Sequence, residues 1–163
     1  MYKNIIMPTD GLDSCVYGTC HGVVLAKTLG AKVTAVCVTK HLTLQEIMRA
    51  YHPEMDWRMS YSRKAPEIVE HAHQKHKELT DKALAVAEKM CSENGVPCTK
   101  VYFEDEDAAE GLLRVAEKEG CDLVFLSRHG HTGIMGKLFG DVAGRIVSKS
   151  RIPVLTHYCG GPS

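Results

Sequence analysis

The sequence predicts an α/β fold, a three-layer α/β/α sandwich in which helices cover both faces of a five-stranded parallel sheet. Short segments rich in apolar and β-branched residues alternate with longer segments in which apolar residues recur at helical spacing. Glycine follows three of the helical segments, at Gly30, Gly95 and Gly120, where it commonly ends a helix. The length of 163 residues, with 44% hydrophobic and 25% charged residues, is typical of a single domain over residues 1–163.

The chain begins with a βαβ unit. Residues 3–8 are predicted as a strand ended by Pro8, residues 13–29 as a helix ended by Gly30, and residues 31–39 as a second strand rich in β-branched residues. Two strands joined through a helix are parallel, because the helix brings the chain back to the end of the sheet at which the first strand began.

Residues 40–65 interrupt this alternation. They hold a candidate short helix at 42–50, the only tryptophan and a polar stretch that leads to Pro66. The segment is too long for an ordinary connection. We therefore expect an insertion that either closes as a lid over the sheet edge or binds a partner.

The second half of the chain continues the alternation. Pro66 suits the first turn of a helix that runs to Glu93 and stops at Asn94 and Gly95. Its inner face is expected to contain Val69, Leu79, Ala83, Val86 and Met90. The remaining predicted elements are a strand at 98–103, a helix at 106–119, a strand at 123–126, a helix at 142–149 and a strand at 152–157.

A glycine-containing loop follows the fourth predicted strand. In an α/β protein such a loop lies at the carboxyl edge of the parallel sheet, directly before the N-terminus of a helix. Unpaired backbone N–H groups and the helix dipole favour anions there. The sequence therefore predicts a phosphate site in the loop, whose glycines are Gly130, Gly133, Gly136 and Gly140.

These residues resemble the glycine motif of the universal stress protein family. Nucleotide-binding members typically carry G-x2-G-x9-G-S/T here, and this chain reads Ser127-x2-Gly130-x9-Gly140-Asp141. The spacing is the same, but Ser127 replaces the first glycine and Asp141 replaces the final hydroxyl residue. The resemblance covers nearly the whole chain, and it implies the strand order 3-2-1-4-5 of the adenine nucleotide alpha hydrolase-like fold.

The resemblance also implies an adenine-nucleotide site. Family members place an Asp at the end of strand 1 beside the adenine and ribose, a position that Asp10 matches, and Val38 matches a position that packs on the adenine. Asp10 would equally serve as a turn residue and helix cap. Arg128 and His129 would either hold a phosphate elsewhere along the loop or be ordinary loop charges. The residues expected at the site are Pro8, Thr9, Asp10, Val38, Ser127, Arg128, His129, Gly130, Gly140, Asp141 and Val142.

The two departures from the motif weaken this site. An ionised Asp141 cannot donate to a phosphate. A carboxylate about 4 Å from a phosphate charge costs on the order of 4 kcal/mol at an effective dielectric constant near 20, roughly three decades in affinity. Ser127 adds a side chain where the backbone has to approach the ligand. As the N-cap of a helix at 142–149, Asp141 would need no ligand.

Two functions fit this pattern. The first is a dimeric stress-response or regulatory module with a degenerate adenine-nucleotide site. The second is a functional ATP or AMP sensor, which would use Mg²⁺ only with ATP and hydrolyse ATP slowly at most. The sequence contains no G-x-S-x-G elbow, H-E-x-x-H motif or Walker loop, so at most a weak ATPase activity is expected.

The last predicted strand lies at a sheet edge, where exposed backbone invites pairing with a second copy. Members of the family resembled here commonly dimerise through this strand, so we expect a homodimer with Val154 and Leu155 at its interface. A further protein partner is the other candidate for binding. Twenty basic and twenty acidic residues cancel, which predicts no binding to nucleic acid or to a membrane.

The first residues lead directly into a strand rather than into a signal peptide, and no apolar window reaches transmembrane length, so a cytoplasmic protein is expected. Seven cysteines without a C-x2-C pair predict reduced and mostly buried thiols, with Cys159 exposed. His71, His73 and His76 share one predicted helix, where surface histidines are favoured over a metal site.

Overall fold

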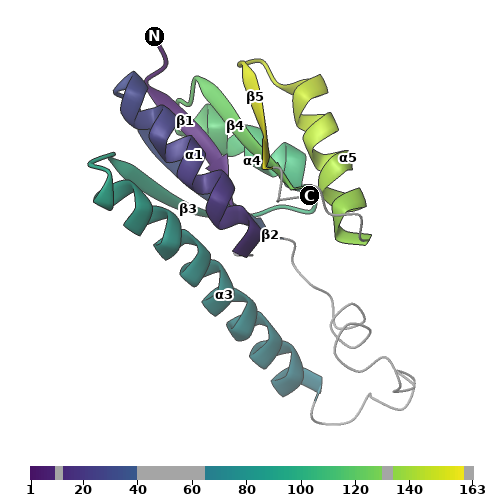
Figure 1. Ribbon diagram of the computed structural model, residues 1–163. Coiled ribbons are helices and arrows are strands. Elements are labelled where there is room, and N and C mark those ends of the chain that lie inside the picture. The colour runs from purple at the N-terminus through teal and green to yellow at the C-terminus, as the bar shows by residue number, and fades with distance from the viewer. Residues whose placement is uncertain (10–12, 40–64, 130–133, 160–163) are drawn as a thin grey trace.

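The computed structural model describes residues 1–9, 13–39, 65–129 and 134–159 (Figure 1). Strands and helices alternate in these ranges, as the sequence predicts. The candidate helix at 42–50 and the expected lid or insertion lie outside the described residues. In chain order, the elements are β1 (Asn4–Pro8), α1 (Asp13–Leu29), β2 (Lys32–Thr39), α3 (Ala65–Glu93), β3 (Cys98–Glu104), α4 (Ala108–Lys118), β4 (Leu123–His129), α5 (Ile134–Lys149) and β5 (Val154–Cys159).

The strands form one parallel sheet in the order β3-β2-β1-β4-β5, so the predicted order is confirmed. β1 lies at the centre, where Ile5 pairs with Val33 of β2 on one side and with Leu123 of β4 on the other. β3 and β5 are the two edges. Because the strands are parallel, all their carboxyl ends lie at one edge of the sheet.

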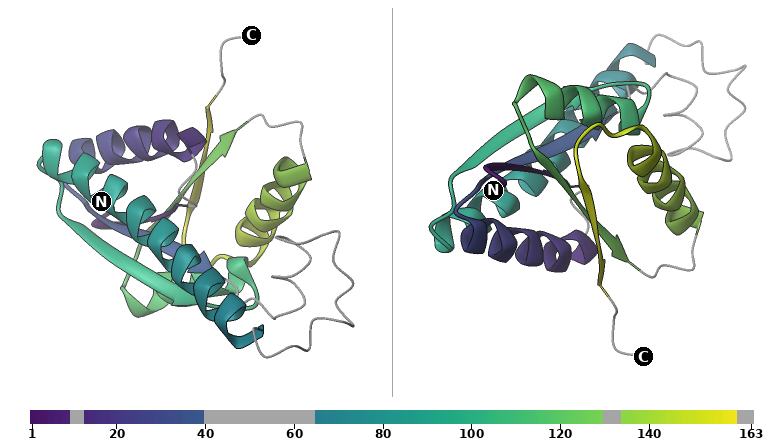
Figure 2. Two further views of the ribbon diagram at one scale, coloured as in Figure 1. Left: turned by 90° about the horizontal axis from the view of Figure 1, so that it is seen from below. Right: turned by 90° about the horizontal axis from the view of Figure 1, so that it is seen from above.

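Helices cover both faces of the sheet, and alternate residues of β1 contribute to two separate cores. Ile5 and Met7 pack with residues of α1 and α3, whereas Ile6 packs with residues of α4 and α5. Figure 2 shows α1 and α5 on opposite sides of β4 and β5. The arrangement is the predicted three-layer sandwich.

The buried face of α3 differs from the predicted one. Leu79 and Val86 were expected in the core but are 53% and 41% exposed, whereas Ala83 is buried and Met90 half-buried. The side chain of Val69 lies outside the described part. Most residues on the face of α3 that packs against the core are small, so the apolar pattern of this face is weak in the sequence. Leu79 and Val86 each lie one position away from this face, and their larger apolar side chains led to the wrong prediction. The face consists of Ala72, Thr80, Ala83, Leu84, Ala87 and Cys91.

The helix after β4 starts earlier than predicted. α5 begins at Ile134, so Gly136 and Gly140 lie within it. Asp141 is inside this helix, and its interpretation as the N-cap of a helix at 142–149 is therefore wrong. A glycine inside a helix costs about 1 kcal/mol relative to alanine, which is why two glycines four residues apart indicated a loop.

The five cysteines whose side chains the structure describes are free thiols, and the side chain of Cys15 lies outside the described part. Cys37, Cys91 and Cys121 are buried, as expected, whereas Cys98 is half-buried and Cys20 is exposed. The side chain of Cys159 lies outside the described part. The exposed thiol is that of Cys20, which lies on α1 on the side of the helix that faces away from the sheet.

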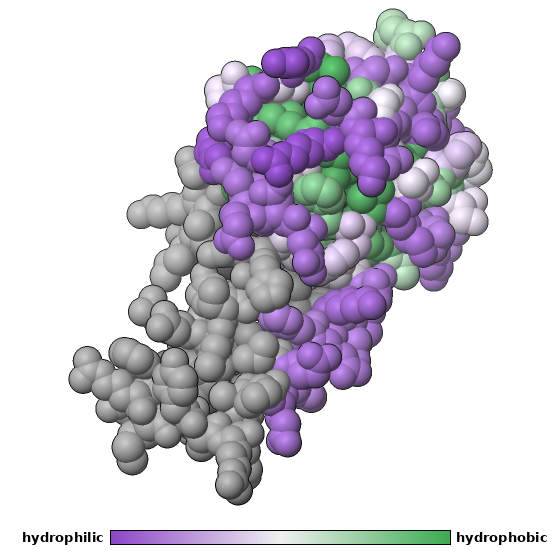
Figure 3. All heavy atoms as spheres, turned by 180° about the vertical axis from the view of Figure 1, so that it is seen from behind, coloured by the Kyte–Doolittle hydropathy of each residue, from purple (hydrophilic) through white to green (hydrophobic). Residues whose placement is uncertain are grey.

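The surface seen from behind is mainly hydrophilic, with smaller hydrophobic areas enclosed by polar and charged side chains (Figure 3). Within the described ranges, none of the helices combines the length and the apolar character needed to cross a membrane.

Candidate functional site

The strand order reverses between β1 and β4. The helices that follow β1 and β2 pack on one face of the sheet, and those that follow β3 and β4 pack on the other. The helices α1 and α5, which follow β1 and β4, therefore lie on opposite faces of the sheet, and in open α/β sheets such a reversal of strand order marks the crevice at the carboxyl edge where ligands bind. Pro8 and Thr9 lie at this edge at the end of β1, and Ser127, Arg128 and His129 end β4 there.

β2 extends beyond the end of β1 at this edge. The pairing of the two strands ends at Pro8 and Val36, and the Thr9 N–H donates to the Val36 carbonyl at 2.8 Å. Backbone groups of residues two apart point to the same side of a strand. The N–H and carbonyl of Val38 therefore point past the last paired residue of β1, and they present one donor and one acceptor at the crevice.

The side chain of Val38 is half-buried and packs against α4. A Cβ built on Gly111 of α4 would lie 2.7 Å from Val38 Cγ1, a distance that real Cβ atoms do not adopt. Gly111 therefore allows α4 to rest directly on β2. Val38 faces the crevice through its backbone, and its packing on an adenine stays a prediction.

The side chain of Ser127 lies against α1. A Cβ built on Gly18 would lie 2.1 Å from the Cβ of Ser127 and 2.3 Å from its Oγ. The serine therefore fits because α1 carries a glycine at the facing position. A glycine inside a predicted helix is the signal in the sequence that points to such a close approach.

His157 on the edge strand also contacts α1. It pairs with Ser127 in the register of β4 and β5, and its ring centroid lies 4.3 Å from that of His21 on α1. The ring of Phe125 is stacked on the same histidine at 6.1 Å. These contacts attach the edge strand to α1 close to the crevice.

The loops of the crevice are only partly described. Asp10 and Gly130 lie outside the described residues, so the expected roles of both stay predictions. Arg128 and His129 are described by their backbone, as the last two residues of β4. The residues expected at the site that the structure brings together at this edge are Pro8, Thr9, Val38, Ser127, Arg128 and His129.

The other expected site residues belong to α5. Gly140 and Asp141 are described by their backbone within this helix. Val142 is half-buried and packs against the core between the sheet and the pair α4 and α5. Val142 is thus a packing residue in the described structure.

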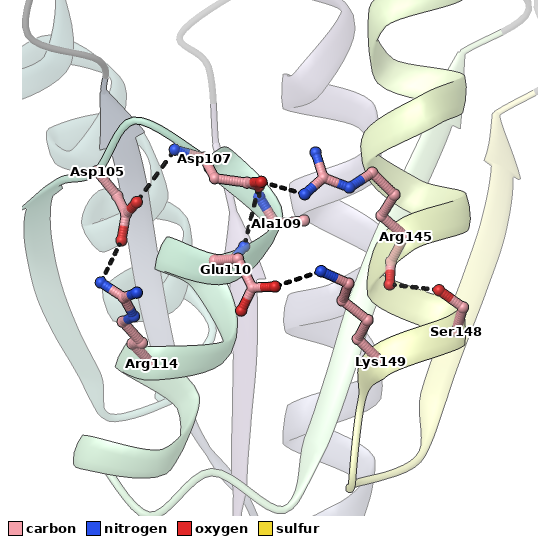
Figure 4. Close-up of polar contacts among 8 residues, drawn as sticks. All are labelled: Asp105, Asp107, Ala109, Glu110, Arg114, Arg145, Ser148 and Lys149. Carbon is pink, nitrogen blue, oxygen red and sulfur yellow. Dashed lines mark hydrogen bonds and ion pairs between the residues drawn. The ribbon is translucent and has the colours of Figure 1, made fainter.

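Ion pairs join the start of α4 to α5 (Figure 4). Asp107 is the N-cap of α4, and its carboxylate accepts hydrogen bonds from the N–H groups of Ala109 at 3.0 Å and Glu110 at 3.2 Å. The same carboxylate pairs with Arg145 of α5, and Glu110 pairs with Lys149. The Arg145 guanidinium, followed by the two backbone donors, lowers the pKa of Asp107.

A second carboxylate orders the turn before α4. Asp105 accepts a hydrogen bond from the Asp107 N–H at 3.0 Å and pairs with Arg114 at 3.0 Å (Figure 4). Its backbone N–H donates to the Thr39 carbonyl at the end of β2 at 2.9 Å. The network therefore connects α5 through α4 to the strand end that presents Val38.

Sequence reasoning missed this network. The contacts at the start of α4 could have been predicted from the sequence, because Asp107-Ala-Ala-Glu110 is a capping pattern at a helix start. The long-range part of the network joins Asp107 to Arg145 and Glu110 to Lys149 across 38 and 39 positions, which no local pattern reveals.

The histidines of α3 do not form a metal centre in the described part of the chain. His71 is exposed and His73 is half-buried, and the side chain of His76 lies outside the described part. No group of three His, Cys, Asp or Glu side chains in the described ranges is arranged to hold a metal ion.

Comparison with known proteins relates the whole chain to one family. The sequence model of the universal stress protein family matches residues 1–156. Universal stress protein MJ0531 of Methanocaldococcus jannaschii is 30% identical over 155 residues, which cover 95% of this chain and 81% of that protein. Several solved structures are similar in fold, among them the following two. The structure of MJ0577 from the same organism covers 99% of both chains with a TM-score of 0.74 at 22% identity. A universal stress protein in complex with cAMP covers 98% of both chains with a TM-score of 0.63 at 18% identity.

Proposed function

The chain belongs to the universal stress protein family, and on this basis we propose that it is a dimeric regulatory module of the stress response with a degenerate adenine-nucleotide site. In this proposal the part of the site that receives the adenosine is retained, and the part that receives the phosphates is weakened. The observation that carries the proposal is the replacement of the hydroxyl residue of the glycine motif by Asp141.

The adenosine part rests on the carboxyl edge of the sheet. The backbone N–H and carbonyl of Val38 lie past the paired part of β1 and match the donor and acceptor pattern of a base edge. Each such hydrogen bond contributes about 0.5–1.5 kcal/mol. A relative of the same fold binds cAMP, which supports a nucleotide of one phosphate as the ligand to test first.

The phosphate part rests on residue type and charge. Asp141 offers a carboxylate in place of a hydroxyl donor, so each added phosphate charge brings further repulsion. Mg²⁺ would reduce this repulsion for ATP by bridging the carboxylate and the phosphates. AMP is therefore expected to bind more tightly than ATP without Mg²⁺, and the difference is expected to shrink when Mg²⁺ is added.

The dimer rests on the edge strand β5. Its only neighbour in the described sheet is β4, so the opposite backbone edge is available to a second copy. Leu155 is 39% exposed and Tyr158 is 65% exposed on this strand, and Val154 is half-buried. Apolar side chains along an exposed strand edge favour a homodimer through β5.

A functional ATP or AMP sensor is the second candidate, and one observation favours it. The Ser127 side chain lies against Gly18 on α1, where this glycine has no side chain of its own. The serine side chain is therefore directed toward the helix and does not block the approach of a ligand to the end of β4. Asp141 is then the single obstacle in the motif. Hydrolysis in this candidate is slow at most.

Calorimetric titration separates the two candidates. AMP and ATP are titrated, with and without Mg²⁺, into protein from which co-purified nucleotide has been removed. The degenerate site predicts weak binding that is weakest for ATP without Mg²⁺. Micromolar ATP affinity without Mg²⁺ would identify a sensor and overturn the proposal.

A further inference from the structure

Two cysteines meet where α3 ends and β3 begins. Cys91 lies in the last turns of α3 and is fully buried in the core that α1 and α3 share with the sheet. Cys98 is the first residue of β3, is half-buried and packs against the same core. The pair therefore combines one sulfur that solvent can reach with one that it cannot.

A tight turn holds the two cysteines in this arrangement. The Val96 N–H donates to the Cys91 carbonyl at 2.8 Å, and the Asn94 side chain donates to the Met90 carbonyl at 2.8 Å. Gly95 adopts a φ of +68°, which a residue with a side chain rarely adopts. β3 then pairs with β2 from Cys98 onward. Both cysteines thus lie on hydrogen-bonded backbone on either side of a short connection.

The two thiols interact with each other and differ in acidity, and the Cys98 thiol also donates to the Thr99 carbonyl at 3.9 Å. The interaction with Cys91 lowers the pKa of Cys98, and the backbone of Ala35 and the charge of Lys100 act in the same direction, against burial and Glu88. The same interaction, together with burial, raises the pKa of Cys91. Cys98 is thus the more nucleophilic sulfur, since the thiolate is the reactive form.

We propose that Cys91 and Cys98 are a peroxide-sensitive thiol pair, in which Cys98 is oxidised first and Cys91 then joins it in a disulfide. The oxidant is a hydroperoxide or hydrogen peroxide. This modification site is independent of the nucleotide site, because the start of β3 lies at the amino edge of the sheet and the crevice lies at the carboxyl edge.

The chemistry of the pair balances in two steps. The Cys98 thiolate attacks one peroxide oxygen, the O–O bond breaks, and the other oxygen leaves as hydroxide or alkoxide and takes up a proton. Sulfur is oxidised by two electrons to a sulfenic acid, and the peroxide is reduced to water or an alcohol. The Cys91 sulfur then attacks the Cys98 sulfur, the S–O bond breaks, and water leaves with the proton of Cys91. A small dithiol restores both thiols by exchange.

Peptide mapping tests the pair directly. The native, reduced protein is treated with increasing hydrogen peroxide, free thiols are alkylated, and the chain is digested with trypsin. Cleavage after Lys89 and Lys100 releases one peptide whose only cysteines are Cys91 and Cys98. We expect this peptide to escape alkylation and to lose two hydrogens at a lower peroxide dose than oxidises Cys20. A second cleavage after Glu93 then yields two fragments held together until a dithiol is added.

Variants assign the two roles. In Cys98→Ser, Cys91 is expected to stay alkylatable at the dose that oxidises the wild type. In Cys91→Ala, the sulfenic acid of Cys98 is expected to accumulate and to react with a 1,3-diketone probe. Cys20→Ala, which removes an exposed thiol, is expected to form the disulfide as the wild type does. The proposal is overturned if Cys91 and Cys98 of the wild type remain alkylatable while Cys20 is oxidised, a result that needs no variant.

Discussion

The side chain of Ser127 on β4 fills the space that a side chain on Gly18 of α1 would occupy. A Cβ on Gly18 would lie 2.1 Å from the Ser127 Cβ. The two positions therefore form a complementary pair across the interface between the helix and the sheet. This pairing explains how the strand end accepts a serine where the glycine motif of the family has a glycine.

Gly18→Ala tests this complementarity. The added methyl group collides with Ser127, and such overpacking costs typically about 1–3 kcal/mol. The free energy of unfolding, measured in urea, is expected to fall by this amount despite the better helix propensity of alanine. In the double variant with Ser127→Gly the clash is removed, so stability is expected to return to the wild-type value or above. A Gly18→Ala variant as stable as the wild type would contradict the packing described.

Asn4 is expected to matter for stability and not for nucleotide binding. It is buried at the start of β1, where it accepts a hydrogen bond from the Thr34 hydroxyl at 2.9 Å and donates to the Glu119 carbonyl at 2.9 Å. Asn4→Ala leaves the buried Thr34 hydroxyl and the partly buried Glu119 carbonyl without this partner, at a cost of about 1–3 kcal/mol. Thr28→Ala, on the exposed face of α1, is the control and should change the free energy of unfolding by no more than about 0.5 kcal/mol. An equal effect of both substitutions would show that the buried network is not stabilising.

The Asp107 carboxylate is expected to make stability depend on pH in the acid range. Its pKa is lowered from the ordinary value of 3.8 in the folded protein, chiefly by Arg145. The unfolded chain therefore binds the proton more tightly, so the stabilisation is present above pH 3.8 and is lost as the pH falls through the folded pKa. Asp107→Asn keeps an N-cap and removes the charge. It should be less stable than the wild type at neutral pH, and the gap should close in strong acid. A gap that does not change with pH would refute this account of the ion pair.

The edge strand is expected to mediate the dimer. Leu155→Lys places a charge on the exposed face of β5, and two such charges repel across a symmetric interface. Sedimentation at micromolar concentration should show a dimer for the wild type and a monomer for this variant. Val24→Lys, at a residue that is 50% exposed on α1, is the matched control and should remain dimeric. A monomeric wild type would contradict the proposed interface.

The sequence pattern was sufficient for the alternation of parallel strands and helices, because short apolar segments alternate with segments of helical spacing, whereas the strand order followed from the resemblance to the family. The pattern was insufficient for the inner face of α3, where alanines and threonine face the core and Leu79 and Val86 face solvent. The start of α5 was missed for a related reason, since Gly136 and Gly140 have a low helix propensity and the helix forms nevertheless.

The candidate site was predicted in the same uneven way. Its place at the carboxyl edge followed from the alternation of strands and helices. The pairing of Ser127 with Gly18, and that of Asp107 with Arg145, involves residues distant in the sequence. Such pairs depend on how the layers pack, and single-sequence patterns carry no information on that packing.

The proposed weakening of the phosphate site is tested most directly by the ATP affinity of Asp141→Ser. Calorimetry without Mg²⁺ compares the wild type, this variant and Glu117→Ser, which changes the net charge equally at an exposed residue near the end of α4. We predict that Asp141→Ser raises the ATP affinity by about one to three decades, whereas Glu117→Ser leaves it unchanged. An ATP affinity that stays as weak in Asp141→Ser as in the wild type would contradict the account.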